Sequence, residues 1–237
     1  MFLITSKFEY CLKNEDGVRT PCEISNENGI LTLINKYIQG YRSLLVIAND
    51  PTDYIDNDNV AQTLYKAFGM TNKKFDMVKV LDNRTLDQAE VLIQSADLIF
   101  MRGGEILRQL QFLQQIDFKG IIENYHGVVV SVSAASMCLT KTICNFPEHE
   151  KELNQPRVLR GLNIVDIRLI PHVDGETLTY QGHTDFANLV QDHILPYSDK
   201  EDLCALPNGS FIMFDGHDHK FFGPCYKIYQ RKMTRFH

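Results

Sequence analysis

The amino-acid sequence predicts a single α/β domain of three layers, with a mainly parallel central sheet, helices on both of its faces and a C-terminal β meander. Through most of the chain, short apolar runs alternate with amphipathic segments, which is typical of parallel strands joined by helices. Near the C-terminus the apolar runs are instead separated by Asn-Gly, Asp-Gly and Gly-Pro turns, which is typical of antiparallel hairpins. At 237 residues, 44% of them hydrophobic, the chain is long enough for one domain over residues 1–237.

The strands expected in the main sheet are short apolar runs that end at turn-forming or helix-forming residues. In chain order they are Phe2–Thr5, Leu44–Ala48, Phe75–Leu81, Asp97–Met101, the first half of Gly127–Leu139, and Asn163–Ile170. Helices are expected where apolar residues recur every three or four positions. These segments are Gly29–Ile38, Asp58–Phe68, Leu86–Gln94, Gly104–Ile116, the second half of Gly127–Leu139, and Thr184–His193. The strands of the terminal meander are expected at Leu203–Leu206, Ser210–Phe214, Lys220–Phe222 and Tyr226–Gln230.

Charge and composition point away from several classes of partner. The net charge of -6 gives no reason to expect nucleic acid or an anionic membrane as a partner. No apolar run is long enough to span a membrane, and the first residues do not resemble a signal peptide, so a cytoplasmic location is expected. The six cysteines show no zinc-ligand spacing and are expected to be reduced thiols, and no cofactor is expected. His217 and His219 would share one face of a strand, but an exposed hairpin explains them better than a metal site.

The junction at Ser133 is the strongest candidate for a catalytic feature. A β-branched run rises to this serine, and small and helix-forming residues follow it at once. Such a strand-to-helix turn is typical of a nucleophile elbow, which lifts a serine hydroxyl beside the free N–H groups of a helix start. Two alternatives remain open: Ser133 caps the next helix without reacting, or Ser136 is the nucleophile.

Three further stretches follow predicted strands, where the carboxyl ends of parallel strands usually hold the active site. Gly103 and Gly104 form a turn in which the backbone can approach a ligand and offer it N–H groups, as an oxyanion hole requires. His172 follows an apolar run and a proline, and is a candidate general base for Ser133. Asn208 lies in a tight turn between two of the terminal strands.

Together these stretches resemble the peptidase E (dipeptidase E and cyanophycinase) family of serine peptidases, which have the class I glutamine amidotransferase-like fold. The most specific parts of the resemblance are Phe100–Leu107, Val130–Met137 and Ile170–Asp174. The resemblance implies that Ser133 is the nucleophile and His172 the base. It also implies that the N–H of Ala134, with that of Gly103 or Gly104, binds the oxyanion. The expected substrate is a small peptide, cleaved through an acyl-enzyme.

The chain departs from the family pattern at the elbow and at the third triad position. Ser131 and Ala135 stand where the family elbow has glycines. Asn208 stands at one position where an acid is expected, and it can orient an imidazole without stabilising an imidazolium as a carboxylate does. Glu148 and Asp174 are possible acids in its place. These departures also fit an alternative, a weak or inactive family member that binds a small ligand or a partner protein.

Substrate preference is a separate question. The resemblance implies recognition of an N-terminal aspartate by an arginine that shortly follows a Gly-Glu-Thr triplet. The triplet is present at residues 175–177, but Leu178 follows it. Leucine cannot pair with a carboxylate as a guanidinium does, and Arg102 and Arg168 are the candidates to compensate. A short-peptide hydrolase without a defined aspartyl preference is therefore expected, and the sequence does not define its oligomeric state.

Overall fold

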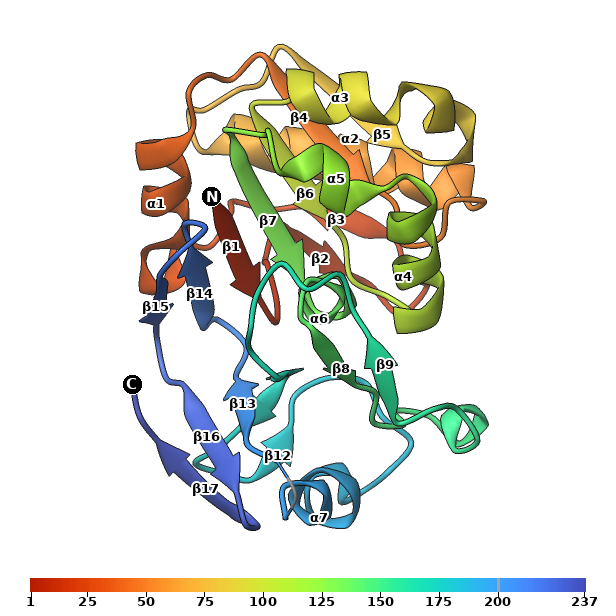
Figure 1. Cartoon of the computed structure of the whole chain (residues 1–237). Coiled ribbons are helices and arrows are strands. Elements are labelled where there is room, and N and C mark those ends of the chain that lie inside the picture. The colour runs from red at the N-terminus through yellow and green to blue at the C-terminus, as the bar shows by residue number, and fades with distance from the viewer. Residues whose placement is uncertain (200) are drawn as a thin grey trace.

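The structure is a computed structural model that describes residues 1–199 and 201–237. Its centre is a seven-stranded sheet in the order β15-β14-β1-β7-β6-β4-β5 (Figure 1). The strands β1, β7, β6, β4 and β5 are parallel, whereas β14 is antiparallel to both of its neighbours. In chain order the strands are β1 (Phe2–Thr5), β4 (Ser43–Ile47), β5 (Met77–Leu81), β6 (Leu98–Met101), β7 (Val128–Val132), β14 (Phe211–Phe214) and β15 (His219–Phe222).

Successive side chains of the parallel strands pack against helices on opposite faces of the sheet, as the two-residue period of a strand requires. On one face Leu45 and Ile47 join a buried cluster with α3 (Ala89–Ser95), α4 (Ile106–Gln115), α5 (Phe118–Ile122) and α6 (Ala134–Cys138). On the other face Leu44 and Val46 pack with α1 (Ile30–Tyr37) and α2 (Tyr54–Met70). The predicted α/β class, with a mainly parallel central sheet between helices, is confirmed. No helix among the described residues is long and apolar enough to cross a membrane.

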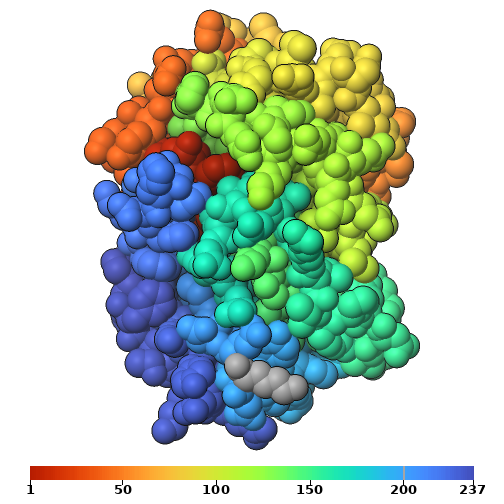
Figure 2. Space-filling model, in the orientation of Figure 1, coloured from red at the N-terminus to blue at the C-terminus, as the bar shows by residue number. Residues whose placement is uncertain are grey.

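A second, smaller sheet lies beyond the carboxyl ends of β1 and β7 (Figure 1). It has the order β10-β13-β16-β17, with β10 at Leu169–Pro171, β13 at Leu203–Leu206, β16 at Tyr226–Tyr229 and β17 at Lys232–Arg235. Its own buried cluster includes Ile170, Ala205 and Ile228. Short hairpins and turns complete the fold: β2 (Cys11–Lys13), β3 (Arg19–Pro21), β8 (Thr142–Cys144), β9 (Val158–Arg160), β11 (Val173–Asp174), β12 (Thr179–Tyr180), and 3₁₀ turns η1 (Glu27–Gly29), η2 (Asn83–Gln88) and η3 (Glu150–Glu152). In Figure 2 the C-terminal part of the chain, cyan to blue, covers the left and centre of the lower half of the surface.

The terminal strands do not form the continuous meander that the turns predict. β13 pairs in parallel with β10 and antiparallel with β16, whereas β14 and β15 extend the central sheet. The reason is burial: all four residues of β14 are buried, so this strand needs cover on both faces, which the central sheet provides. The tight turn that holds Asn208 therefore joins the two sheets.

Two other predicted elements differ in the structure. Within Asn163–Ile170 only the last two residues belong to a strand, because Asn163 has a left-handed φ of 55° and the N–H groups of residues 164 and 165 donate to the carbonyl of Leu139 after α6. The helix expected over Thr184–His193 is replaced by a π-helical turn, η4 (Val190–Ile194), and the short α7 (Leu195–Tyr197). Its first residues bond elsewhere, since the N–H of Asp185 donates to the Glu148 carbonyl.

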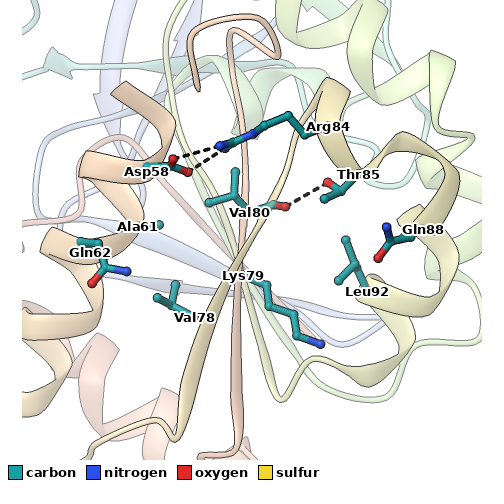
Figure 3. A pocket seen from close by; sticks show the side chains of 10 residues that line it. All are labelled: Asp58, Ala61, Gln62, Val78, Lys79, Val80, Arg84, Thr85, Gln88 and Leu92. Atoms are coloured by element: carbon teal, nitrogen blue, oxygen red, sulfur yellow. Dashed lines mark hydrogen bonds and ion pairs between the residues drawn. The ribbon is translucent and has the colours of Figure 1, made fainter. Parts of the chain in front are cut away.

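One of the two edge strands of the central sheet is β5, which lies beside a surface hollow of about 550 Å³ between α2 and η2 (Figure 3). The Thr85 side chain forms hydrogen bonds with backbone groups at the C-terminal end of β5. Its hydroxyl donates to the carbonyl of Val80 at 3.0 Å and accepts the N–H of Asp82 at 3.2 Å. These two groups would otherwise be open to another strand, so Thr85 limits pairing at the edge. The hollow is separated from Ser133 by the strands β4 and β6, and contains none of the predicted site residues.

Candidate active site

Ser133 lies between β7 and α6 with backbone angles φ 52° and ψ -117°. This region is sparsely populated by residues other than glycine and costs about 1–3 kcal/mol, so neighbouring contacts must hold the turn. The Ser133 N–H donates to the Thr5 carbonyl at 2.9 Å, and the Met137 N–H donates to the Ser133 carbonyl at 3.0 Å. The strand β1 and the helix α6 therefore fix the serine in a strained elbow.

Small buried hydroxyl groups support the elbow from below. Ser136 donates to the Thr5 carbonyl at 2.9 Å, and its oxygen lies 3.0 Å from the Ser131 oxygen. Both side chains are fully buried, as is Ala135. The residues that replace the glycines of the family elbow thus fit the turn, and Ser136 is a structural hydroxyl rather than the accessible nucleophile considered as an alternative.

The structure brings Ser133, His172 and Asn208 together from three separate segments. The Nε2 atom of His172 lies 2.9 Å from the Ser133 Oγ, and its Nδ1 atom lies 2.7 Å from the Asn208 Oδ1. His172 itself has a left-handed φ of 64°, and its N–H donates to Ser6 at 3.2 Å. The Ser6 hydroxyl in turn donates to the carbonyl of Leu206, so it ties the histidine turn to the asparagine turn.

Burial of His172 favours the neutral form of its imidazole. It lowers the pKa of His172 below the usual value, and the hydrogen bond that the ring donates to Asn208 opposes this effect. The edge of the Tyr180 ring packs against the imidazole, with ring centres 5.8 Å apart and planes at 79°. The lowered pKa favours an imidazole with one unprotonated nitrogen, which a base needs.

Neither of the two predicted acids reaches His172. Asp174 accepts the N–H of Glu176 at 2.8 Å and so closes the turn between β11 and β12. Glu148 accepts a hydrogen bond from the Tyr180 hydroxyl, and burial raises the pKa of its carboxyl. The group on the Nδ1 side of His172 is the neutral amide of Asn208.

The glycine turn after β6 passes directly beside the elbow. A Cβ atom added to Gly103 would lie 2.9 Å from the Ser133 Cβ and 3.0 Å from the Val132 carbonyl oxygen. A Cβ atom on Gly104 would overlap the side chain of Asn49, which holds the turn by accepting the Glu105 N–H at 3.1 Å. Both positions therefore require glycine for space.

The N–H groups of the glycine turn and of the first residue of α6 were predicted to bind the oxyanion. Within residues 1–199 and 201–237, no acceptor is found for the N–H of Gly103, Gly104 or Ala134. Ala134 is the first residue of α6, where N–H groups have no partner inside the helix. The prediction that these N–H groups bind an oxyanion is therefore compatible with their hydrogen bonding.

The two arginines considered for substrate binding are already paired with carboxylates. Arg102, just before the glycine turn, lies 2.7 Å from Asp56. Arg168 lies 2.5 Å from Glu201. Leu178 lies in the turn between β11 and β12 and is 39% exposed. A guanidinium dedicated to a substrate carboxylate is therefore not evident at these positions.

Two contributors to the site had no signal in the sequence. Ser6 follows β1 in the chain and Gln181 follows β12, yet both contact the segments that hold His172 and Asn208. The main-chain N–H of Gln181 also donates to the His172 carbonyl at 2.6 Å. Because these contacts join residues far apart in the sequence, only the folded chain reveals them.

A family model described as Peptidase family S51 matches residues 29–222. Among solved structures, the chain is similar to a peptidase from an acI-B1 Actinobacterium, with a TM-score of 0.66 and 16% identity over 99% of this chain and 93% of that one. It is also similar to a putative peptidase E protein from Listeria monocytogenes EGD-e, with a TM-score of 0.56 and 16% identity over 93% of this chain and 96% of that one. The comparison with curated proteins gave no match. The two structures establish a shared fold, and because the family model spans most of the chain, this protein belongs to peptidase family S51.

Proposed function

We propose that this protein is a serine hydrolase that cleaves short peptides through an acyl-enzyme, with Ser133 as nucleophile and His172 as general base. Membership of a peptidase family supports a peptidase function in general. The observation that carries the specific proposal is the 2.9 Å contact between the Ser133 hydroxyl and His172 Nε2. A strained serine next to a neutral, oriented imidazole is the arrangement that activates a hydroxyl.

In the proposed mechanism, Nε2 of His172 takes the hydroxyl proton as the Ser133 oxygen attacks the peptide carbonyl carbon. The carbonyl oxygen becomes an oxyanion, which the N–H of Ala134 and that of Gly103 or Gly104 stabilise. His172 then gives its proton to the departing amine, the C–N bond breaks, and an ester to Ser133 remains. Water attacks this ester with the help of the same base, which releases the acid and restores the serine hydroxyl.

Asn208 should affect the rate of the proposed hydrolysis rather than its chemical steps. Its amide oxygen orients His172, but it carries no charge to stabilise the imidazolium that forms in the transition state. We therefore expect slow hydrolysis compared with a site that has a carboxylate at this position. We also expect no strong preference for an N-terminal aspartate, since Leu178 offers no cation and Arg102 is paired with Asp56.

The test is hydrolysis of a mixed dipeptide and tripeptide library, followed by mass spectrometry, with Ser133→Ala as the matched control. The proposal requires products with the parent protein and none with the variant. A fluorophosphonate probe, which labels activated serines, gives a second reading that does not depend on choosing the right peptide. Equal cleavage by both proteins contradicts the role of Ser133.

The alternative is a catalytically weak or inactive member that binds a small ligand or a partner protein. The neutral Asn208 favours it, because a triad without a carboxylate loses part of its catalytic stabilisation. Absence of both peptide cleavage and probe labelling would support this alternative.

A further inference from the structure

The glycine turn after β6 has no side chains of its own to anchor it. Gly103 and Gly104 are also the residue type whose backbone changes conformation most freely. Their N–H groups have no acceptor in the part of the chain that the structure describes. An oxyanion hole, however, requires donors that are in place before the reaction begins. A neighbouring segment must therefore hold this turn.

Asn49, which follows β4, makes two hydrogen bonds to the main chain of this turn. Its Oδ1 atom accepts the Glu105 N–H at 3.1 Å, and its Nδ2 atom donates to the Glu105 carbonyl at 3.0 Å. Since a main-chain N–H only donates and a carbonyl only accepts, the two bonds define which way the Asn49 amide faces. The same side chain occupies the space beside Gly104 where a Cβ atom would lie.

Gln109, in the first turn of α4, binds the remaining donor of Asn49. Its Oε1 atom accepts from the Asn49 Nδ2 atom at 2.8 Å, and its own NH₂ group donates to the Ala48 carbonyl at 3.2 Å. Asn49 is 6% exposed and Gln109 is fully buried. Because buried amide groups are costly to leave unpaired, this pair firmly joins the end of β4, the glycine turn and the start of α4.

We infer that Asn49 is a positioning residue that holds the glycine turn beside the Ser133 elbow, so that its N–H groups face the developing oxyanion. Gln109 contributes by anchoring Asn49. The catalytic consequence rests on the proposed hydrolase function, whereas the effect on the turn does not. The two effects can therefore be measured separately.

The variant to make is Asn49→Asp, which keeps the shape of the side chain and replaces its NH₂ group by an oxygen. That oxygen would face two acceptors, the Glu105 carbonyl and the Gln109 Oε1 atom. Asn145→Asp is the matched control, because Asn145 is 5% exposed and its NH₂ group also donates to a glutamine side chain and a main-chain carbonyl, at 3.2 and 3.1 Å. These partners, residues 155 and 156, are not among the predicted site residues.

The position of the turn is measured by NMR on protein labelled with ¹⁵N only at glycine, without any substrate. The spectrum then contains the amide signals of the 14 glycines alone. We expect the signals of Gly103 and Gly104 to shift in Asn49→Asp and to keep the parent positions in Asn145→Asp. If Asn49→Asp folds poorly, Gln109→Met removes the anchor of Asn49 and should shift the same two signals.

Activity provides the second measurement. We expect kcat to fall by about 10- to 100-fold in Asn49→Asp, because the oxyanion donors are displaced but not removed. KM should change little, since the oxyanion forms only in the transition state. Asn145→Asp should keep the parent kcat. Adding Gln109→Met to Asn49→Asp should have little further effect on kcat, because Gln109 acts through Asn49.

The outcomes separate this inference from the proposed function. Unchanged Gly103 and Gly104 signals in Asn49→Asp, or equal shifts in Asn145→Asp, overturn the positioning role. Shifted signals with an unchanged kcat overturn its catalytic part. Shifted signals in a protein whose parent form cleaves no peptide support the hold on the turn and contradict the proposed hydrolase function.

Discussion

Replacing Asn208 by aspartate tests whether the neutral third group limits the proposed reaction. The two side chains have nearly the same shape, and the acceptor oxygen lies 2.7 Å from His172 Nδ1. The substitution therefore adds a negative charge next to the imidazole with little change in packing. If the proposed mechanism holds, this charge should stabilise the imidazolium that forms as Ser133 loses its proton.

The size of the effect follows from the attraction between the new charge and the imidazolium. Unit charges about 4 Å apart attract by roughly 4 kcal/mol at an effective dielectric constant of about 20. The second aspartate oxygen would face the Gln181 carbonyl, now 3.5 Å from the Asn208 NH₂. Losing that donor and partly burying a charge costs about 2 kcal/mol, but this cost is the same before and during the reaction, so it lowers the free energy of unfolding and leaves kcat unchanged. A gain of up to about 4 kcal/mol in the transition state corresponds to roughly a 1,000-fold increase in kcat.

The assay is kcat at several pH values, for the best peptide found in the library, in Asn208→Asp, Asn208→Ala and the parent. The charge should also raise the pKa of His172, which burial now lowers. Since the base must be neutral, activity falls as the pH drops through this pKa, so the aspartate variant should lose activity at a higher pH than the parent. A variant with a raised pKa and no gain in kcat at high pH would refute the reasoning, because the charge would be present without effect.

Four further results are expected. Ser133→Gly should abolish activity but raise the free energy of unfolding in urea by about 1 kcal/mol, because glycine relieves the backbone strain at this position. Ser133→Ala should abolish activity without this gain in stability, and equal free energies of unfolding for the two variants would contradict the strain. Gly103→Ala should lower kcat/KM by about 100-fold by displacing the elbow, since the new Cβ would lie 2.9 Å from the Ser133 Cβ; unchanged kinetics would contradict this close contact. Thr85→Val should lower the free energy of unfolding by about 1–2 kcal/mol, because it leaves the Val80 carbonyl without its partner, and Thr85→Ser should restore it. The lowered pKa of His172 means that the unfolded chain binds its proton more readily, so the free energy of unfolding should fall as the pH drops below about 6.5, and less steeply in His172→Gln.

The sequence predicts the parts of the fold that depend on local patterns. Apolar runs such as those of β4 and β7 identify buried strands, and the abrupt change at Ser133 identifies the elbow, because a strand-to-helix junction has a local signature. The contact between His172 and Ser133 agrees with what the family resemblance implies. The expected reason does not hold, because β10, which precedes His172, belongs to the small sheet, whereas β7 belongs to the central sheet.

The features that the sequence does not predict are those that depend on which strands pair and which side chains form hydrogen bonds with each other. β14 and β13 have similar apolar sequences, yet one joins the central sheet and the other the small sheet. In the site, Asp174 and Glu148 are plausible acids by residue type, but the turn of Asp174 and the Tyr180 hydroxyl take up their oxygens. Residue type states which bonds are possible, and the fold determines which of them form.

The neutral Asn208 affects two properties of His172: the fraction of the imidazole that is unprotonated, and its strength as a base. An aspartate would stabilise the imidazolium and raise the pKa of His172, so part of the histidine would be protonated near neutral pH. With Asn208, burial dominates and the pKa of His172 is lowered, so protonating the base requires a lower pH than it would beside an aspartate. A weaker base removes a proton less readily, and the rate near neutral pH should suffer. The proposed site therefore exchanges rate near neutral pH for activity that persists as the pH falls.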